Sequence, residues 1–377
     1  MQPDYSIVVF SHLRWNFVYQ RPQHLLSRLA ATRPVFFVEE PEFDPDGHPR
    51  WERTSPHSNV VVLKPRTPVQ VPGFHADQLP LLEPLIAQLA QELEGRTIVT
   101  WLYTPMALPL AEALAPAVVV YDCMDELALF LGAPTELLSR EAALIECADV
   151  MFTGGPSLFR AKQTRHSNVH CFSSSVDAAH FRVRQRGVQD AQDQEAIPHP
   201  RLGFYGVIDE RLDLSLIDFV AEARPQWQIV LVGPVVKIDP ASLPRRDNIH
   251  YFGQRTYDEL PRYLAGWDVC LLPFARNDAT RFISPTKTLE YMAAELPIVS
   301  TPITDVAEPY GEIVYLGDTP TEFLAACEAA LESGPEERAS RTARMRRVLA
   351  GTSWDVTASA MEKLLAAAVV KKTAVPA

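Results

Sequence analysis

Short apolar runs rich in β-branched residues alternate with longer amphipathic stretches along almost the whole chain. This alternation is typical of βα units, which build parallel sheets with helices on both faces. In the first half the predicted strands are residues 6–10, 34–38, 59–63, 97–101, 117–121, 149–153 and 168–172. In the second half they are residues 201–206, 227–233, 249–253, 268–274, 297–301 and 312–316. The pattern predicts two doubly wound α/β domains that face one another.

A polar stretch without periodicity interrupts this rhythm at residues 182–200 and ends in Pro-His-Pro. Such a stretch is typical of a connection between domains. We therefore expect a first Rossmann-like domain over residues 1–178, a linker over 179–200, a second Rossmann-like domain over 201–352 and a final helix over 353–377. The length of 377 residues suits two ordinary domains.

The composition disfavours several classes of protein. A net charge of -12 argues against a nucleic-acid partner, because a nucleic-acid binder normally shows a basic surface. The five cysteines lack CxxC spacing, which disfavours a disulfide framework and a metal site and suits a reducing compartment. No apolar run approaches the roughly 20 residues of a membrane span. We expect a cytoplasmic protein, with peripheral contact to the inner face of a membrane left open.

In open α/β sheets ligands bind beyond the carboxyl ends of the strands, so the residues that follow each strand are candidates for the site. A long aromatic loop follows the first strand and lacks GxGxxG, which disfavours a nicotinamide dehydrogenase. His12, Trp15 and Arg21 are its candidate substrate-binding residues, because aromatic faces stack on substrates and a guanidinium meets anions. The alternative is a surface loop with Trp15 and Phe17 tucked into the core.

Two acids, Asp122 and Asp125, come directly after the strand at 117–121. A carboxylate at this edge could accept the proton of an incoming hydroxyl group. Asp125 could instead cap the next helix, which is common for Asp before an apolar run. Both interpretations can hold for different members of the pair.

The second half offers further candidates at its strand ends. Arg211, near a predicted helix start, could meet a diphosphate in a bidentate way, although an isolated arginine is more often a solvated surface residue. Gly233 follows a strand and would let the backbone approach a ligand closely. Gly253 and Arg255 repeat this arrangement after the next strand.

The stretch SPTKTLEYMAAE, residues 284–295, predicts a polar turn and a helix. The hydroxyls of Ser284 and Thr286, the Lys287 ammonium and the free amides of the first turn would form an anion site. Glu290 lies on the same helix face and could accept hydrogen bonds from two neighbouring hydroxyls, as a ribose offers. On spacing alone, a surface pair of Lys287 and Glu290 is the simpler interpretation.

Together these segments resemble a known family. The segments 231–234, 263–274 and 284–301 resemble the donor domain of GT-B glycosyltransferases of the family 4 type, also called glycosyl transferases group 1. Residues 11–25 and 121–126 resemble a narrower subgroup that makes teichuronic acids and exopolysaccharides. The resemblance implies two Rossmann-like domains facing a central cleft, the nucleotide on the second domain, the acceptor on the first, and a last helix crossing back to the first domain.

The resemblance also implies roles for individual residues. Glu290 matches the ribose-binding glutamate, and Ser284 to Lys287 match the turn that binds the diphosphate. Arg211 approximates a phosphate-binding residue, and Gly233 and residues 252–255 match segments around the phosphates and the base. The family pattern places a sugar-recognising acid where this chain has Phe282. Asp278 or Asn277 could supply that function.

We therefore expect a metal-independent glycosyltransferase that needs no cofactor and uses a UDP-sugar as donor. Its acceptor would be a carbohydrate or a lipid-linked sugar in the assembly of a cell-surface polysaccharide or glycolipid. Asp125, with Asp122 second, would activate the acceptor hydroxyl if the anomeric configuration is inverted, and these acids would only position the acceptor if it is retained. Two alternatives are a nucleotide-sugar epimerase of the same fold and a non-catalytic nucleotide-sugar-binding protein.

Overall fold

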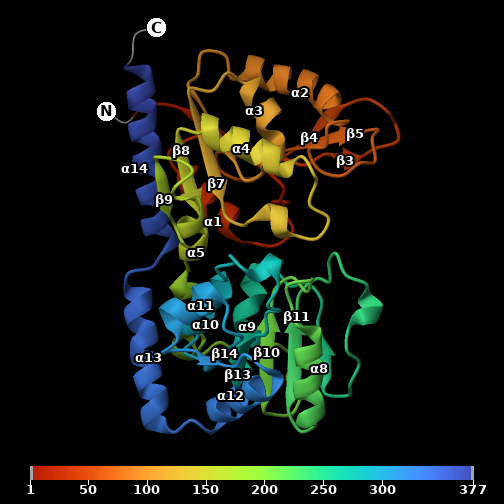
Figure 1. Cartoon of the computed structure of the whole chain (residues 1–377), viewed down its shortest axis with the longest axis vertical. Helices are drawn as coiled ribbons and strands as arrows, with labels where there is room; N and C mark the ends of the chain where they lie inside the picture. The colour runs from red at the N-terminus through yellow and green to blue at the C-terminus, as the bar shows by residue number, and fades with distance from the viewer. Residues whose placement is uncertain (1–2, 375–377) are drawn as a thin grey trace. The chain divides into compact units, whose positions relative to one another are not determined.

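The computed structural model describes residues 3–374 and is shown in Figure 1. The chain divides into two compact units. Unit 1 holds the described residues up to Ser173 together with those from Trp354 onward, and unit 2 holds Ser174–Ser353. Each unit has its own sheet with helices on both faces (Figure 1).

Unit 1 is built on a nine-stranded sheet in the order β3-β5-β2-β1-β6-β7-β8-β9, with β4 added beside β5. All neighbouring strands are parallel except β4 and β5, which are antiparallel. The strands are β1 (Ser6–Ser11), β2 (Val35–Glu39), β3 (Glu42–Phe43), β4 (Arg50–His57), β5 (Val60–Thr67), β6 (Ile98–Leu102), β7 (Val118–Cys123), β8 (Val150–Thr153) and β9 (Val169–Cys171).

Helices cover both faces of this sheet because its central strands are apolar on both sides. Helices α1 and α14 share one hydrophobic core, where the His24 ring stacks on Trp354 with centroids 4.8 Å apart. Figure 1 shows α2, α3 and α4 on the other side. The helices are α1 (Arg21–Leu29), α2 (Leu79–Glu92), η1 (Pro105–Ala107), α3 (Leu108–Glu112), η2 (Leu127–Leu129), α4 (Leu137–Cys147), α5 (Pro156–Lys162) and α14 (Trp354–Thr373).

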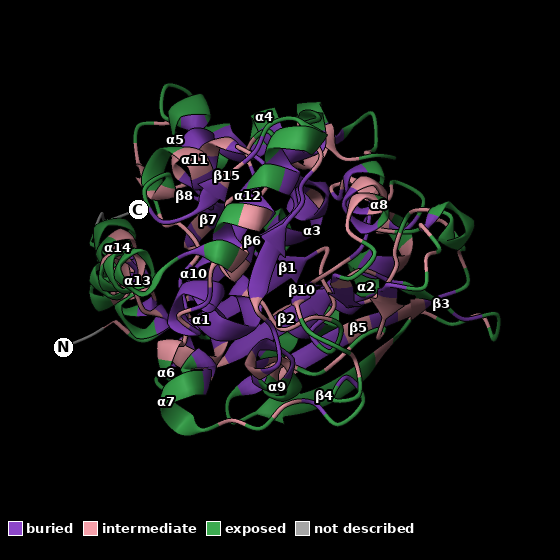
Figure 2. Ribbon diagram, turned by 90° about the horizontal axis from the view of Figure 1, so that it is seen from below, coloured by how far each residue is buried: buried purple, intermediate pink, exposed green. Residues whose placement is uncertain are grey.

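The short β3 and the eight-residue β4 are absent from the strands expected from the sequence. Strand β4 has the sequence RWERTSPH, and all its side chains are exposed or half-buried, as Figure 2 shows. An edge strand exposed on both faces has no apolar alternation, so the periodicity that marks a buried strand is missing.

Unit 2 has a six-stranded parallel sheet in the order β12-β11-β10-β13-β14-β15. One face is covered by the core that includes α9 and α10, and the other by the core of α8 and α12. Its strands are β10 (Arg201–Tyr205), β11 (Gln228–Val232), β12 (Ile249–Tyr251), β13 (Val269–Leu272), β14 (Ile298–Ser300) and β15 (Tyr315–Leu316). Its helices are α6 (Ala178–Phe181), α7 (Val183–Arg186), α8 (Leu214–Ala223), η3 (Pro240–Ser242), η4 (Tyr257–Glu259), α9 (Leu260–Ala265), η5 (Asp278–Thr280), α10 (Thr286–Ala293), α11 (Thr304–Tyr310), α12 (Pro320–Glu332) and α13 (Pro335–Ala350).

Residues 179–200, expected as a linker, lie within unit 2. Most of their polar side chains are exposed, but the half-buried Asp190 and the buried Gln194 are paired within the unit. The buried Arg201 donates to Asp190 at 2.6 Å, and the buried Gln194 donates to the Tyr263 carbonyl at 2.9 Å. A polar stretch can therefore pack as part of a domain when its hydrogen bonds are satisfied internally.

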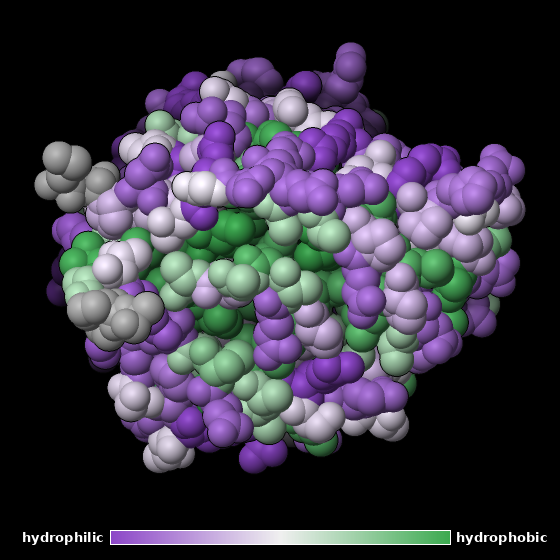
Figure 3. Space-filling view, turned by 90° about the horizontal axis from the view of Figure 1, so that it is seen from above, coloured by the Kyte–Doolittle hydropathy of each residue, from purple (hydrophilic) through white to green (hydrophobic). Residues whose placement is uncertain are grey.

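The surface carries few large apolar side chains. Figure 3 shows apolar side chains gathered in the middle of one face, surrounded by hydrophilic ones. The large hydrophobic residues with high exposure among the described residues are Phe17, Phe43, Leu131, Leu138, Val356 and Val370. Within residues 3–374, none of the helices combines the length and the apolar character needed to span a bilayer.

Helix α10 ends without a glycine, as the sequence indicates, yet it still ends in the left-handed conformation. Glu295 takes that conformation itself, with φ of 58°. Arg346 holds its carboxylate through two hydrogen bonds of 2.7 and 3.0 Å. For a residue with a Cβ, the left-handed region costs roughly 1–2 kcal/mol.

Replacing Glu295 with glycine should remove this backbone strain, whereas replacing it with alanine should not. We expect Glu295→Gly to be more stable than Glu295→Ala by about 1 kcal/mol, which corresponds to a Tm difference of about 2–4 °C. Thermal unfolding of both variants measures the difference, and both lack the exposed ion pair to Arg346. Equal Tm values would show that the conformation carries no strain.

Candidate functional site

The strand order of unit 2 creates a switch point between β10 and β13. From one edge of the sheet to the other, the strands are the third, second, first, fourth, fifth and sixth of the unit along the chain. The chain connections therefore leave β10 and β13 toward opposite sides. Ligands of open α/β sheets bind beyond the carboxyl ends of the strands at such a point. The segments that follow β10, β11 and β13 therefore define the candidate site of unit 2.

Two glycines allow close packing of the loops at this edge. Gly206 follows β10 with φ of 137°, and Gly233 follows β11 with φ of 152°. A Cβ at Gly233 would overlap the carbonyl group of Gly206, and one at Gly206 would overlap the Lys287 side chain. Both positions therefore need glycine, and the Lys287 side chain lies directly over the turn after β10.

The start of α10 is tied to a neighbouring segment of unit 2. The Thr286 hydroxyl donates to the Ser174 hydroxyl oxygen at 3.0 Å, and Ser174 donates to the Ser284 carbonyl at 2.9 Å. Pro285 occupies the N-cap position, one residue before the helix, instead of its first turn. The Lys287 ammonium lies 5.5 Å from the centroid of the Phe204 ring.

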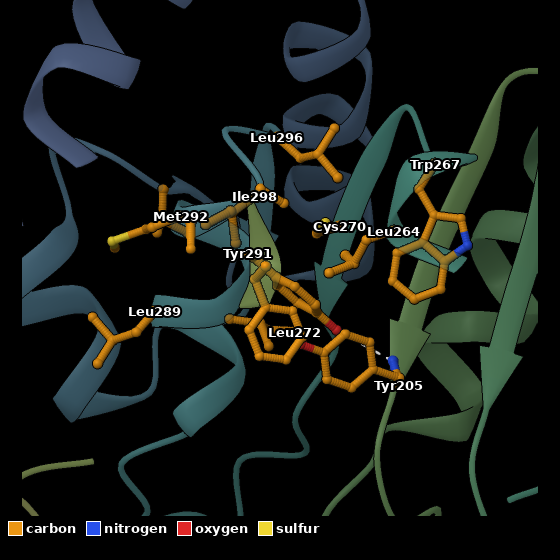
Figure 4. Close-up of a cluster of buried hydrophobic side chains, with 14 of the residues drawn as sticks. Tyr205, Leu264, Trp267, Cys270, Leu272, Leu289, Tyr291, Met292, Leu296 and Ile298 are labelled. Carbon is orange, nitrogen blue, oxygen red and sulfur yellow. Dashed lines mark hydrogen bonds between the residues drawn. The ribbon is translucent and has the colours of Figure 1, made fainter. Parts of the chain in front are cut away.

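Glu290 is buried, with only 6% of its surface exposed. Its Oε2 accepts a hydrogen bond of 2.5 Å from the Tyr205 hydroxyl. The Tyr205 backbone N–H in turn donates to the Tyr291 hydroxyl oxygen at 3.2 Å. Figure 4 shows these two tyrosines side by side in the apolar cluster with Trp267. The structure therefore rules out the interpretation of Glu290 as one half of a surface ion pair.

Burial also changes the protonation of Glu290. Loss of water around the carboxylate raises its pKa to about 7, although the hydrogen bond from Tyr205 and the charge of Lys287 act in the opposite direction. A glutamate with this pKa gains or loses its proton near neutral pH. Perturbed groups of this kind concentrate at functional sites.

The loops after β10 and β13 bring Arg211 and Asn277 to the same edge. Ala275 N–H donates to the Arg211 carbonyl at 2.8 Å, and the Asn277 amide donates to the Glu210 carbonyl at 3.0 Å. The Arg211 guanidinium is held by the buried Asp209 carboxylate at 2.6 Å. Asp209 fixes the guanidinium and offsets part of its charge, but the Arg211 side chain is 28% exposed and so remains accessible to an anionic group.

Gly253 and Arg255 have a different environment. A Cβ at Gly253 would meet nothing within 4 Å, so the close backbone approach expected there is not required by the fold. Arg255 donates to Asp193 at 2.7 Å and to the Tyr263 hydroxyl at 2.6 Å. These contacts secure residues 190–195 to α9, and they account for Arg255 without a ligand.

In unit 1, Asp122 and Arg21 form a buried ion pair instead of two separate ligand-binding groups. The Asp122 oxygens accept hydrogen bonds of 3.1 and 2.9 Å from Arg21, which also donates to the Phe172 carbonyl at 2.7 Å. Asp122 is fully buried, and Arg21 is 2% exposed. This pairing argues against Asp122 as a base and against Arg21 as an anion site, because each already neutralises the other.

Asp125 is partly exposed and follows Asp122 on a loop that is held firmly. Gly154 lets the Met124 backbone approach closely, because a Cβ there would overlap the Met124 carbonyl group. The buried Lys162 binds Glu126 at 2.6 Å and Glu141 at 2.7 Å. No helix begins with Asp125 as its N-cap, so the capping interpretation does not apply. No pattern in the sequence indicates this role of Lys162.

The loop that follows β1 divides its side chains between core and surface. Trp15 is 5% exposed and packs on Phe37, with ring centroids 5.1 Å apart. His12 is partly exposed, and Phe17 is 38% exposed. The alternative interpretation, a surface loop with both aromatic rings in the core, therefore agrees with the structure for Trp15 and disagrees for Phe17.

Comparison with known proteins agrees with this architecture. A family model described as glycosyl transferases group 1 matches residues 199–333. TuaH of Bacillus subtilis (strain 168), a glycosyltransferase named for teichuronic acid biosynthesis, is 28% identical over 294 residues, with 72% of each chain covered. Sucrose-phosphate synthase from Thermosynechococcus elongatus has a similar structure, with a TM-score of 0.69, 16% identity, and coverage of 96% of this chain and 98% of that one.

Anabaena HepE, solved in complex with UDP and glucose, has a TM-score of 0.67 at 14% identity, with 96% of this chain and 99% of that one covered. These likenesses, with the two Rossmann-like sheets, define the fold as GT-B. These comparisons support a glycosyltransferase that resembles group 1. The comparisons give the epimerase alternative no support.

The two acids of the loop after β7 should respond differently to removal of their charge. Asp122→Asn leaves the Arg21 guanidinium buried without a counter-charge and should destabilise the protein by about 3–5 kcal/mol. Asp125→Asn, at a partly exposed position, should change stability by only about 0.5 kcal/mol. Thermal unfolding of the two variants tests this contrast. A stable Asp122→Asn variant would contradict the structural role of the pair.

Glu290 should make stability fall as the pH rises through its pKa. The carboxyl is protonated in the folded protein up to about pH 7 but loses its proton near 4.5 when unfolded. Its contribution is therefore complete below about pH 4.5 and is lost as the pH approaches and passes 7. Between pH 6 and 8 the wild type should lose roughly 1 kcal/mol relative to Glu290→Gln. Parallel melts at both pH values measure this, and a constant difference would refute it.

Proposed function

We propose that this glycosyltransferase uses a UDP-sugar bound at the switch point of unit 2 and transfers the sugar to a hydroxyl of a saccharide acceptor on unit 1. The buried Glu290 at the start of α10, one turn from Lys287, carries the proposal. The complex of HepE with UDP and glucose supports the choice of nucleotide. The name of TuaH supports a role in assembling a cell-surface polysaccharide.

Charge complementarity supports a diphosphate beside α10. The Lys287 ammonium, the fixed guanidinium of Arg211 and the amides of the helix start would face the phosphate oxygens. These groups are preorganised, because Asp209 orients Arg211 and the glycine turn supports Lys287. They would stabilise the charge that develops on the leaving diphosphate.

Glu290 complements this arrangement by binding the ribose. Its Oε2 is occupied by Tyr205, so its second oxygen and the remaining lone pairs would accept hydrogen bonds from ribose hydroxyls. A carboxylate serves better than a carboxylic acid, because only the ionised form offers acceptors on both oxygens. Nucleotide affinity should therefore rise as Glu290 ionises above pH 7.

The reaction breaks the bond between the anomeric carbon and the diphosphate oxygen and forms a bond from that carbon to the acceptor oxygen. In an inverting displacement the acceptor proton passes to Asp125, which is partly exposed at the end of β7. In a retaining displacement Asp125 only positions the acceptor. Asp122 is not a candidate for this proton, because Arg21 already binds both of its oxygens.

Isothermal titration with nucleotides tests the donor site. We expect UDP to bind, and Lys287→Ala to weaken it by about tenfold or more, since a hydrogen bond to a charged group contributes about 1.5–3 kcal/mol. Wild type should bind 2′,3′-dideoxy-UDP more weakly than UDP, whereas Glu290→Ala should bind the two equally. Glu336→Ala, at an exposed glutamate of α13, serves as the matched control.

Each outcome of this titration bears on a different part of the proposal. Absence of binding by UDP, GDP and dTDP would overturn the donor site. Preference for GDP or dTDP would keep the site and correct the base. A Glu290→Ala variant that still distinguishes the dideoxy nucleotide would remove Glu290 from the ribose.

A further inference from the structure

A groove of about 420 Å³ lies beside the loop after β1, within unit 1. Its walls come from Asn16 and Phe17 of that loop and from Glu52, Thr54 and Lys64 of the β4–β5 hairpin, among others. Its volume is within the range of small-ligand sites. None of the residues expected to bind the acceptor, His12, Trp15 and Arg21, is part of its lining.

The charged groups of this hairpin groove are held in fixed positions by one another. Lys64 binds Glu42 at 2.9 Å and Glu52 at 2.8 Å. Arg14 binds Glu39 at 3.3 Å, and the Trp15 N–H donates to the other oxygen of Glu39 at 2.8 Å. Each carboxylate retains lone pairs for further hydrogen bonds. Because the side chains are already ordered, a ligand would bind them with little loss of conformational entropy.

Phe17 adds an apolar surface to this polar groove. Its side chain is 38% exposed, although an aromatic ring is normally buried at least in large part. A sugar ring has an apolar C–H face and a rim of hydroxyls, and this combination matches an aromatic face next to carboxylate, amide and hydroxyl groups. The groove therefore has the chemistry of a carbohydrate subsite.

The charge of the groove limits which sugars fit. Three carboxylates, Glu39, Glu42 and Glu52, line it together with two cations, Arg14 and Lys64. Arg66 also binds Glu42 at 2.7 Å and Glu52 at 3.6 Å, so three cations balance the three carboxylates. The groove therefore has no net positive charge to attract uronates or phosphorylated sugars. An uncharged sugar would meet hydrogen-bond acceptors without electrostatic repulsion.

The groove also lies away from Asp125, the acid proposed to act on the acceptor hydroxyl. The groove is lined from the loop after β1 and from β5, and these strands are two and four positions from β7 in the sheet. At about 4.8 Å per strand this corresponds to roughly 10 and 19 Å. Both separations exceed the length of one sugar ring. A sugar held in the groove is therefore a different unit of the acceptor from the one that receives the donor sugar.

We propose that the hairpin groove binds an uncharged sugar unit of an oligosaccharide acceptor, at a distance from the reacting hydroxyl, with Phe17 stacked on the ring. This proposal rests on the glycosyl-transfer function proposed above. It assigns acceptor recognition to the exposed face of the loop after β1 and to the hairpin, and it requires an acceptor longer than a monosaccharide.

Saturation-transfer NMR on the full chain tests the groove with cellobiose and N,N′-diacetylchitobiose as neutral probes and digalacturonate as the anionic probe. We expect signals from at least one neutral disaccharide, an affinity at least tenfold weaker in Phe17→Ala, and weaker binding of digalacturonate. Phe43→Ala is the matched control, because Phe43 is 41% exposed and does not line the groove. It should bind the disaccharides as the wild type does.

Three results would overturn the proposal: no signal from either neutral probe, an unchanged affinity in Phe17→Ala, or tighter binding of digalacturonate. Titration of UDP into the same samples separates this failure from that of the donor site. UDP binding without disaccharide binding would refute the groove alone. Disaccharide binding without UDP binding would instead refute the proposed donor.

Discussion

The cost of burying a carboxylate shapes both halves of this glycosyltransferase. Parallel sheets are apolar on both faces. Polar residues that directly follow their strands therefore lie against the apolar core and lose part of their contact with water. A carboxylate in that position must be paired with a cation or shift its pKa. Unit 1 uses the first solution at Asp122, which Arg21 neutralises with two hydrogen bonds. Unit 2 uses the second at Glu290, whose hydrogen-bond donor is the neutral hydroxyl of Tyr205.

These two solutions have opposite consequences for function. A paired carboxylate such as Asp122 stabilises the fold and keeps no strong affinity for a ligand. A buried carboxylate whose hydrogen-bond donor is a neutral hydroxyl, such as Glu290, is stabilised in its ionised form by any further donor. Hydroxyl groups of a ligand would supply such donors. The protein stability that is lost as Glu290 ionises near pH 7 is therefore linked to the proposed affinity of this carboxylate for a ribose.

The sequence predicted the strands well where burial imposes a pattern. The apolar runs at 6–10 and 201–206 correspond to β1 and β10. Central strands of a parallel sheet are buried on both faces, so their sequences are continuously apolar and easily distinguished from polar loops. Strand β4 was not predicted, since both of its faces are exposed and its sequence, RWERTSPH, is polar. Residues 179–200 were expected as a linker for a related reason. Asp190 and Gln194 within them are paired with Arg201 and Tyr263, which a single sequence does not reveal.

The candidate site was predictable in its location but only partly in its residues. The strand ends indicated Lys287, Arg211 and Gly233 as candidates at one edge, because topology alone brings those ends together. Spacing did not distinguish a buried Glu290 from a surface ion pair, since the difference depends on Tyr205, which is 85 residues away in the chain. The pairing of Arg21 with Asp122, 101 residues apart, was equally hidden.

The loop after β1 shows why local chemistry does not determine which side chains a ligand can reach. Trp15 and Phe17 are two residues apart, and either could have packed in the core. Trp15 is the buried one: its ring packs on Phe37, and its backbone N–H donates to the Glu39 carboxylate. That same glutamate binds Arg14, so the contact that buries Trp15 also fixes one wall of the hairpin groove. The Glu39 carboxylate at the end of β2 therefore links the position of the loop after β1 to the groove that Phe17 lines.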